Sequence, residues 1–372
     1  MRSWDIFCHV VDNYGDIGVT WRLARQITAE LKEPVRLFVD DLNAFRHLCP
    51  QINVSKAQQE IMDVHVVRWQ QDLQTSPADV VIEAFGCPIP EDFVIEMQRR
   101  EPASIWINLE YLSAESWVEE CHLLPSPQNV GPKKYFFFPG FTNSTGGLLR
   151  ETGLLEQRDH FLAERRQDFL QRLGVYPSPN SRLISLFTYE NPQIGSWLDS
   201  LTQGSEACHI LVPPGRVTKN VEEWLGVAQL RPNERHSRGS LVIQTIPFLS
   251  QQDYDRLLWS CDLNIVRGED SFVRAQWAGK PFIWHIYQQE ENAHLVKLNA
   301  FLDRYLERVD AITAGNIKQL WMDWNTNQPL SQSWLTWQQN SRRIETSAAA
   351  WSTELGMQKS LVESLAEFAQ NC

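Results

Sequence analysis

The feature that most constrains the fold of this chain is a regular alternation between short apolar segments and helix-like patterns. In the first half, the apolar segments cover residues 4–11, 35–41, 64–69, 79–85 and 104–112. Their apolar residues are mostly continuous rather than alternating with polar ones, which is typical of parallel strands buried on both faces of a sheet. Helical patterns such as that over 17–31 join them. The alternation therefore predicts an α/β fold with a doubly wound parallel sheet.

The same alternation resumes in the second half of the chain, with apolar segments over 182–190, 209–215, 241–248, 263–268 and 281–287. A helical stretch ends at Gly174, and the turn-rich segment VYPSPNS separates the halves. A length of 372 residues suits two domains. We therefore expect two facing Rossmann-like domains, 1–178 and 182–350, with C-terminal helices packing back across the cleft. The last helix, over 351–372, is expected to return to the first domain.

The C-terminal part of the chain is rich in tryptophan at helical spacing. Trp321 and Trp324 are three residues apart, as are Trp334 and Trp337. Such pairs are able to stack on a sugar, but aromatic residues at this spacing are more often part of a helix's buried face. We predict that all four pack in the core.

Charge and composition narrow the functional classes. The formal net charge of −12 opposes electrostatic binding to nucleic acid and favours a basic partner. The seven cysteines are scattered without a CxxC pair, which argues against a disulfide framework and a zinc site. No apolar run approaches the roughly 18 residues of a membrane span, and the N-terminus lacks a signal-peptide pattern. We expect a cytoplasmic protein that binds neither membranes nor nucleic acid.

The loop over residues 12–18, DNYGDIG, follows the first predicted strand and opens the first helix. A Rossmann domain places its phosphate-binding glycines here, but Asp12 and Asp16 would repel a phosphate. Two carboxylates at the mouth of a cleft suit a cationic group or a proton acceptor. Helix capping is the alternative for Asp16, and it accounts less well for Asp12, which falls at the strand end.

A second loop occupies the matching position of the second domain, in the segment VRGEDSFVRAQWAGKPF (266–282). A turn at Gly268 leads to a short helix, with Asp270 or Ser271 as its N-cap. A helix start presents backbone N–H groups to an anion, so a diphosphate would be well placed there.

Charged residues flank this helix start. Arg267 and Arg274 supply cations, and Glu269 and Asp270 would face the hydroxyls of a ribose or sugar. A capped helix with an Arg–Asp surface pair is the alternative. Because ligands of doubly wound sheets bind at the carboxyl ends of strands, two such loops in facing domains favour an active site in the interdomain cleft.

Other strand ends of the second domain carry groups suited to a base. Phe187 and Tyr189 end one strand, and Phe248 and Gln251 follow another. Aromatic side chains there are able to sandwich a nucleobase, although isolated phenylalanines are more commonly core residues.

No pattern in the sequence calls for a metal or a nucleophilic serine. The DYD segment at 253–255 lies in a predicted helix, where positions i and i+2 point apart. The nine histidines lack ligand spacing, and there is no GxSxG elbow. We expect catalysis without metal or cofactor.

Five segments carry a family resemblance that spans nearly the whole chain. They read DIFCHVVDNYGDIGVTWRLARQ, NLEYLSAE, GGLLRE, IPFLSQQDYD and RGEDSFVRAQWAGKPFIWHIY. In them the chain resembles the elongation factor P arginine rhamnosyltransferases, inverting enzymes of the two-Rossmann GT-B architecture. The resemblance implies transfer of L-rhamnose from dTDP-β-L-rhamnose to one arginine of elongation factor P, without metal.

The resemblance also implies roles for individual residues. Asp16 matches the general base and Asp12 its supporting carboxylate, while Glu269 matches an essential acidic residue. The donor-site polar groups correspond to Arg267, Asp270, Ser271 and Tyr189, and the thymine pocket corresponds to Phe187, Phe248 and Gln251. The nucleotide is expected in the second domain and the protein acceptor on the first.

Two alternatives share this architecture. A nucleotide-sugar epimerase would release a free sugar and need no protein acceptor. A non-catalytic adaptor would bind the translation factor and would keep its cellular role without Asp12 and Asp16.

Overall fold

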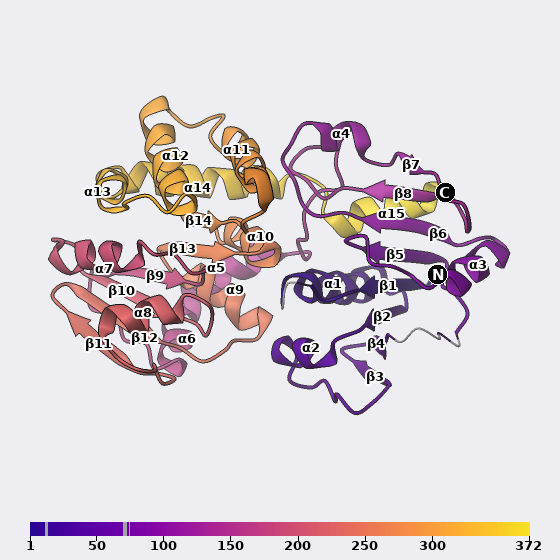
Figure 1. The fold of residues 1–372 in the computed structure, drawn as a ribbon, viewed down its shortest axis with the longest axis horizontal. Helices are drawn as coiled ribbons and strands as arrows, with labels where there is room; N and C mark the ends of the chain where they lie inside the picture. Colours follow the sequence, from indigo (N-terminus) through magenta and orange to yellow (C-terminus); the bar gives the residue numbers. More distant parts are fainter. Residues whose placement is uncertain (12–13, 70–72, 74) are drawn as a thin grey trace. The chain divides into compact units, whose positions relative to one another are not determined.

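The computed structural model describes residues 1–11, 14–69, 73 and 75–372. These residues form two compact units. The first unit comprises Met1–Thr152 together with Met357–Cys372, and the second comprises Gly153–Gly356. Each unit contains one sheet flanked by helices (Figure 1).

The sheet of the first unit contains eight strands among the described residues. They are β1 (Trp4–Cys8), β2 (Val35–Val39), β3 (Gln58–Ile61), β4 (Val64–Arg68), β5 (Val80–Ala84), β6 (Ile105–Leu109), β7 (Pro125–Ser126) and β8 (Lys134–Phe137). Their order is β3-β4-β2-β1-β5-β6-β8-β7, and the pairs are parallel except for the edge strands β3 and β7. This confirms the predicted parallel sheet.

Helices cover both faces of this sheet. They are α1 (Gly15–Gln26), continued by the π-helical turn η1 (Ile27–Leu31), α2 (Leu42–Leu48), α3 (Glu91–Arg99), α4 (Trp117–Cys121) and α15 (Leu361–Asn371). Ile6 of β1 packs in the core shared with α1, α2 and α15, whereas the adjacent Phe7 packs with Phe93 of α3. Because neighbouring residues of a strand point to opposite faces, all five residues of β1 are buried, and its one charged residue, Asp5, pairs with Arg36 of β2.

The sheet of the second unit contains six strands within the described part of the chain. They are β9 (Arg182–Leu186), β10 (Cys208–Val212), β11 (Arg235–Arg238), β12 (Leu241–Thr245), β13 (Leu263–Arg267) and β14 (Phe282–His285). The order is β11-β12-β10-β9-β13-β14, with β11 antiparallel at one edge. Since β9 and β13 pair in parallel, with Leu186 opposite Ile265, their carboxyl ends lie side by side.

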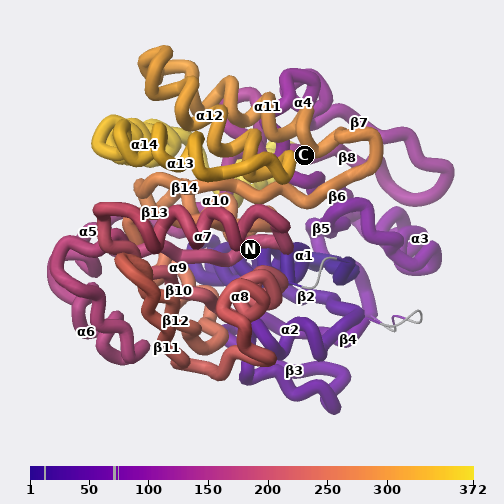
Figure 2. The backbone as a smooth tube through the Cα atoms, turned by 60° about the vertical axis from the view of Figure 1, so that its left-hand side comes forward, coloured from indigo at the N-terminus to yellow at the C-terminus, as the bar shows by residue number. Residues whose placement is uncertain are grey.

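The helices of the second unit surround this sheet. They are α5 (Leu154–Glu164), α6 (Arg166–Arg172), α7 (Ile194–Gln203), α8 (Thr218–Leu225), α9 (Gln251–Ser260), α10 (Glu269–Trp277), the 3-10 turn η2 (Glu290–Asn292), α11 (Ala293–Tyr305), α12 (Ala311–Asn325), α13 (Ser331–Gln339) and α14 (Ser341–Gly356). In Figures 1 and 2, α11 to α14 gather beyond the β14 edge of the sheet. The four tryptophans predicted as core, Trp321, Trp324, Trp334 and Trp337, are all buried there, which confirms the packing interpretation.

The units divide the chain differently from the predicted domains. The helices α5 and α6 precede the predicted boundary at 178 but belong to the second unit, because they pack on α9. Phe161 lies edge-on to Trp259 at 5.5 Å, and Arg166 donates two hydrogen bonds to the carbonyl of Ser260. The helix that joins the first unit is α15, whereas residues 351–356 are the end of α14 in the second unit.

The helices described by the structure include none that combines the length and the apolar character of a membrane span.

Candidate active site

Asp16 lies just beyond the carboxyl end of β1, in the first turn of α1. Its side chain is buried, with 3% of the residue exposed. Oδ2 accepts a hydrogen bond from the backbone N–H of Val11 at 2.9 Å, and Oδ1 accepts one from the hydroxyl of Tyr111 at 3.1 Å. Both partners lie outside α1, so the carboxylate ties together two loops at the edge of the sheet. Asp12, predicted to support it, lies outside the described residues.

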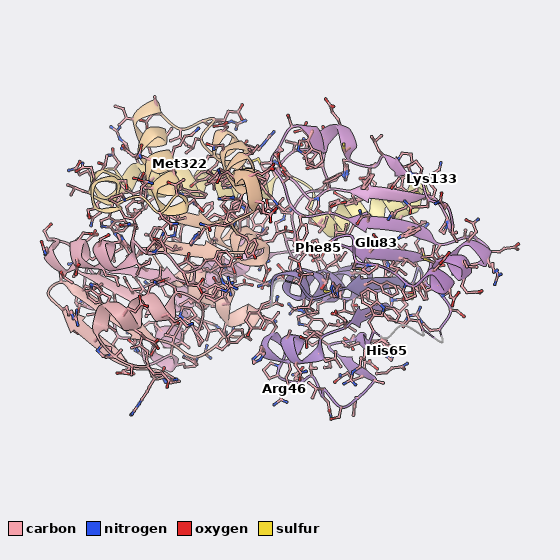
Figure 3. All side chains as sticks on the ribbon, in the orientation of Figure 1. Arg46, His65, Glu83, Phe85, Lys133 and Met322 are labelled. Atoms are coloured by element: carbon pink, nitrogen blue, oxygen red, sulfur yellow. The ribbon has the colours of Figure 1, made fainter. Side chains whose placement is uncertain are left out.

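Tyr111 was not predicted as a site residue, although it belongs to the quoted segment NLEYLSAE. It follows the carboxyl end of β6, and its ring stacks on that of Phe85, with centroids 4.4 Å apart and planes at 15°. Phe85 directly follows the neighbouring strand β5, where Figure 3 labels it together with Glu83. Its backbone φ of +58° is unusual for a bulky residue.

Arg267, the last residue of β13, is the centre of the candidate donor site in the second unit. Only 8% of it is exposed, and its guanidinium carbon lies 5.0 Å from the ring centre of Phe187 and 4.9 Å from that of Tyr189. Among the described residues, no group accepts a hydrogen bond from its buried Nε. A buried donor without an acceptor is costly, and an anionic ligand would satisfy it. The structure thus brings together three of the predicted donor residues.

The helix start beside Arg267 differs in detail from the prediction. Gly268, with φ +63°, is the N-cap of α10, so Glu269, Asp270 and Ser271 form its first turn, where Asp270 or Ser271 was expected to cap. The correction has a local cause. Glycine adopts the positive φ without strain, which lets the helix begin directly after the turn.

Two further residues predicted for the donor site, Gln251 and Phe248, lie in the segment that follows β12. Gln251 begins α9, is buried, and donates from Nε2 to Oδ2 of Asp270 at 3.3 Å. Phe248 is 38% exposed, which is high for a core aromatic residue. Tyr254, missed by the sequence analysis, lies edge-on to Phe187 at 5.6 Å, and burial raises its pKa, so the phenol stays protonated. The aromatic residues of the candidate donor site therefore include Tyr254 in addition to those predicted.

His285, at the end of β14, borders the same cluster. Its ring lies edge-on to that of Tyr189 at 5.4 Å. Burial, followed by the nearby positive charge of Arg267, lowers the pKa of His285 to about 3. The imidazole is therefore neutral at physiological pH, and the positive charge beside the ring of Tyr189 comes from Arg267 and from Arg216, whose guanidinium carbon lies 5.7 Å from the ring centre.

Arg274 does not supply the second cation that the sequence suggested. It is 1% exposed, and its Nε and Nη2 donate to the two carboxylate oxygens of Asp255 at 2.9 and 2.7 Å. This buried pair joins α9 to α10 and accounts for one carboxylate of the DYD segment. The other, Asp253, pairs with Arg256 at 2.7 Å. Within the residues that the structure describes, no cluster of side chains suits a metal ion.

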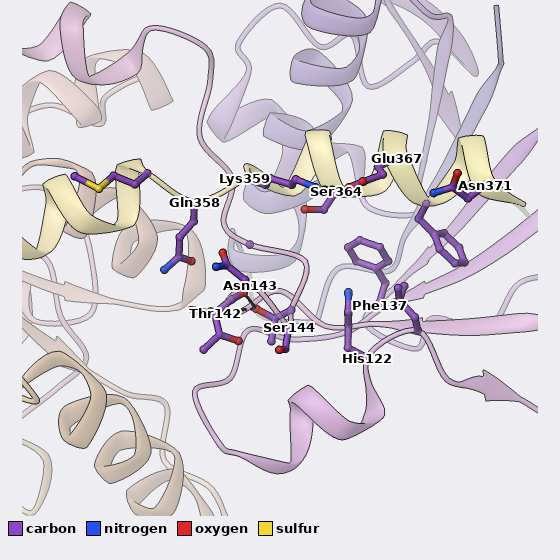
Figure 4. A pocket seen from close by; sticks show the side chains of 15 residues that line it. His122, Phe137, Thr142, Asn143, Ser144, Gln358, Lys359, Ser364, Glu367 and Asn371 are labelled. Atoms are coloured by element: carbon purple, nitrogen blue, oxygen red, sulfur yellow. Dashed lines mark hydrogen bonds and ion pairs between the residues drawn. The ribbon is translucent and has the colours of Figure 1, made fainter.

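A separate cavity of about 840 Å³ lies in the first unit, between the loop that follows β8 and the helix α15 (Figure 4). It is lined by His122, Leu123, Phe137, Thr142, Asn143, Ser144, Thr145, Gly147, Met357, Gln358, Lys359, Ser364, Glu367, Phe368 and Asn371. None of the predicted site residues is among them.

Comparisons with known proteins agree with this architecture. A sequence model of the family described as Elongation-Factor P (EF-P) rhamnosyltransferase EarP matches residues 4–370. A protein-arginine rhamnosyltransferase of Pseudomonas putida is 52% identical over 372 residues, covering 99% of both chains. A solved EarP structure, from work on arginine glycosylation of translation elongation factor EF-P, is 38% identical with a TM-score of 0.73, covering 100% of this chain and 99% of that one. MurG of Acinetobacter baumannii, 12% identical with a TM-score of 0.53 over 100% and 99% of the two chains, shares the fold.

Proposed function

Because this chain belongs to the elongation factor P rhamnosyltransferase family and is a protein-arginine rhamnosyltransferase, we propose that it moves L-rhamnose from dTDP-β-L-rhamnose to one arginine of elongation factor P, with inversion. The resemblance seen in the sequence motifs, the glycosyltransferase class and the GT-B fold are confirmed. The epimerase and adaptor alternatives find no support in relatives that are named as transferases.

The observation that carries the acceptor half of this proposal is the buried carboxylate of Asp16, bonded through both oxygens at the end of β1. A guanidinium has no free lone pair at neutral pH, so a carboxylate must orient it and take its proton. In the proposed step, a guanidinium nitrogen forms a bond to C1 of rhamnose as one N–H proton passes to Asp16. The electrons of the breaking C1–O bond leave with dTDP. Attack from the face opposite dTDP inverts the anomeric centre.

The donor half rests on the cluster around Arg267. The guanidinium and the backbone N–H groups at the start of α10 would hold the diphosphate and stabilise the charge that develops as dTDP leaves. Phe187 and Phe248 would flank the thymine, with Gln251 as its hydrogen-bond partner. The sugar hydroxyls would face the first turn of α10, which contains Glu269, Asp270 and Ser271. The two carboxylates of this turn repel phosphate and therefore suit hydroxyl groups. No step in this scheme needs a metal ion.

The charge of the chain favours the proposed partner. A net charge of −12 attracts a basic protein surface, and such complementarity raises the rate of encounter. A surface arginine of a translation factor fits this expectation.

The direct test is to incubate the protein with dTDP-β-L-rhamnose and elongation factor P in EDTA and to measure the intact mass of the factor. The proposal expects one added deoxyhexose and one dTDP released per factor. We expect the NMR spectrum of the glycopeptide to show an α-linked sugar. Release of dTDP without a change in the mass of the factor would contradict the proposed acceptor.

A further inference from the structure

We propose that Tyr111, supported by Phe85, is a positioning residue that fixes the carboxylate of Asp16 for proton transfer. The inference rests on the proposed function, in which Asp16 is the base. It assigns a role to the segment NLEYLSAE, whose residues have none in the scheme above.

The contact that suggests this role joins residues 95 positions apart in the chain. The hydroxyl of Tyr111 donates to Oδ1 of Asp16 at 3.1 Å, while the backbone of Val11 donates to Oδ2 at 2.9 Å. One donor on each oxygen restrains rotation of the carboxylate about its Cβ–Cγ bond. A fixed carboxylate plane holds the lone pairs of both oxygens in set directions, which is what a base needs to meet an incoming N–H group.

The backbone places Tyr111 and Phe85 side by side. They follow the adjacent parallel strands β6 and β5, in which Leu109 lies opposite Ala84. The N–H of Phe85 donates to the carbonyl of Leu109 at 2.7 Å, which continues the pairing one residue beyond β5. The aromatic rings then stack at 4.4 Å. The stack sets the direction of the Tyr111 side chain, and with it the position of the hydroxyl.

Two observations argue that this arrangement serves more than packing. Phe85 adopts a φ of +58°, a strained conformation for a bulky side chain, and residues in such conformations cluster at functional sites. Tyr111 is 43% exposed even though its hydroxyl is bonded to a buried carboxylate. A core tyrosine would be covered, whereas a residue beside a substrate site is expected to be partly exposed.

The test compares kcat and KM for rhamnosyl transfer in Tyr111→Phe, which keeps the ring and removes the hydroxyl. We expect kcat to fall on the order of tenfold, with KM for dTDP-β-L-rhamnose and for elongation factor P unchanged, because only the orientation of the base is lost. Phe85→Leu removes the stack but keeps the hydroxyl, and should lower kcat in the same direction by a smaller factor. Tyr135→Phe, on β8 with its ring against Phe368, is the matched control and should leave kcat unchanged.

A double-mutant cycle with Asp16→Asn separates this inference from the proposed function. If Tyr111 acts through Asp16, Tyr111→Phe should cause no further loss of the single-turnover rate in the Asp16→Asn background. An equal loss in both backgrounds, or an unchanged kcat in folded Tyr111→Phe, would overturn the positioning role. A normal rate in Asp16→Asn alone would instead reject Asp16 as the base. Thermal unfolding and dTDP binding of each variant establish that it is folded.

Discussion

The substitution Arg267→Met tests whether Arg267 of the second unit binds the anionic diphosphate of the donor. Met retains an apolar side chain of similar length between the rings of Phe187 and Tyr189 but removes the charge and the buried Nε. We expect a large loss of affinity for dTDP and little change in stability.

The affinity for dTDP should fall. A hydrogen bond to a charged group contributes about 1.5–3 kcal/mol. Since each 1.4 kcal/mol is about a factor of ten, the Kd should rise by roughly 10- to 150-fold.

Stability of the protein without ligand should change little. The wild-type guanidinium gains about 0.5–2 kcal/mol from its aromatic neighbours. It loses about 1–3 kcal/mol because the buried Nε has no acceptor among the described residues. These contributions have opposite signs and similar size, so the free energy of unfolding of Arg267→Met should lie within about 1 kcal/mol of wild type.

The assay combines calorimetric titration with dTDP and urea unfolding without ligand. Arg274→Met is the control, because it removes the bidentate partner of the buried Asp255 and should cost about 3–5 kcal/mol of stability. If Arg267→Met instead destabilised the protein as much as Arg274→Met and left the Kd for dTDP unchanged, Arg267 would be a structural residue and the reasoning would be refuted.

Further predictions concern the base pocket, metal and pH. Phe248→Ala should weaken dTDP binding by about tenfold through lost stacking, without changing the affinity for elongation factor P, and an equal loss of both in titrations would argue against a base pocket. Titration in EDTA should give an unchanged Kd for dTDP, and loss of binding there would reveal a metal. Burial lowers the pKa of His209 to about 4, so the unfolded chain binds the extra proton as pH falls below 6.5, and stability is lost in that window. Between pH 7 and pH 5, His209→Gln should therefore lose roughly 2 kcal/mol less unfolding free energy than wild type, and an equal loss in both proteins would contradict the assignment.

The sequence predicts those parts of the fold that depend on local pattern. Strands such as β1 and β13 are buried at every position because both faces of the sheet are covered, and their largely apolar sequences are recognisable without a structure. The edge strand β3 reads QQEI and is mostly exposed, so its pairing with β4 leaves no apolar pattern. The structure groups α5 and α6 with the second unit through contacts with α9, and these contacts join segments about 90 residues apart, so no local pattern in the sequence reveals them.

The candidate site, like the fold, is predictable from the sequence only where its residues are adjacent in the chain. Arg267 and Gly268 are recognisable because strand end, turn and helix start are adjacent in the chain. The partner of Arg274 is Asp255, 19 residues away, and only tertiary packing reveals that this arginine is already paired. The contact between Tyr111 and Asp16 is equally invisible in the sequence, although the position of Tyr111 after a strand was a signal that it lay at the functional edge of the sheet.

The central claim, that Asp16 takes the guanidinium proton, is tested most directly by the single-turnover rate of Asp16→Asn at saturating donor and acceptor. Asparagine caps a helix about as well as aspartate, so a mere cap would leave rate and stability nearly unchanged. The account predicts that rhamnosyl transfer to elongation factor P falls by roughly two or more orders of magnitude while the Kd for dTDP-β-L-rhamnose stays within about a factor of two. A folded Asp16→Asn protein that binds both substrates and transfers rhamnose at the wild-type rate would contradict it.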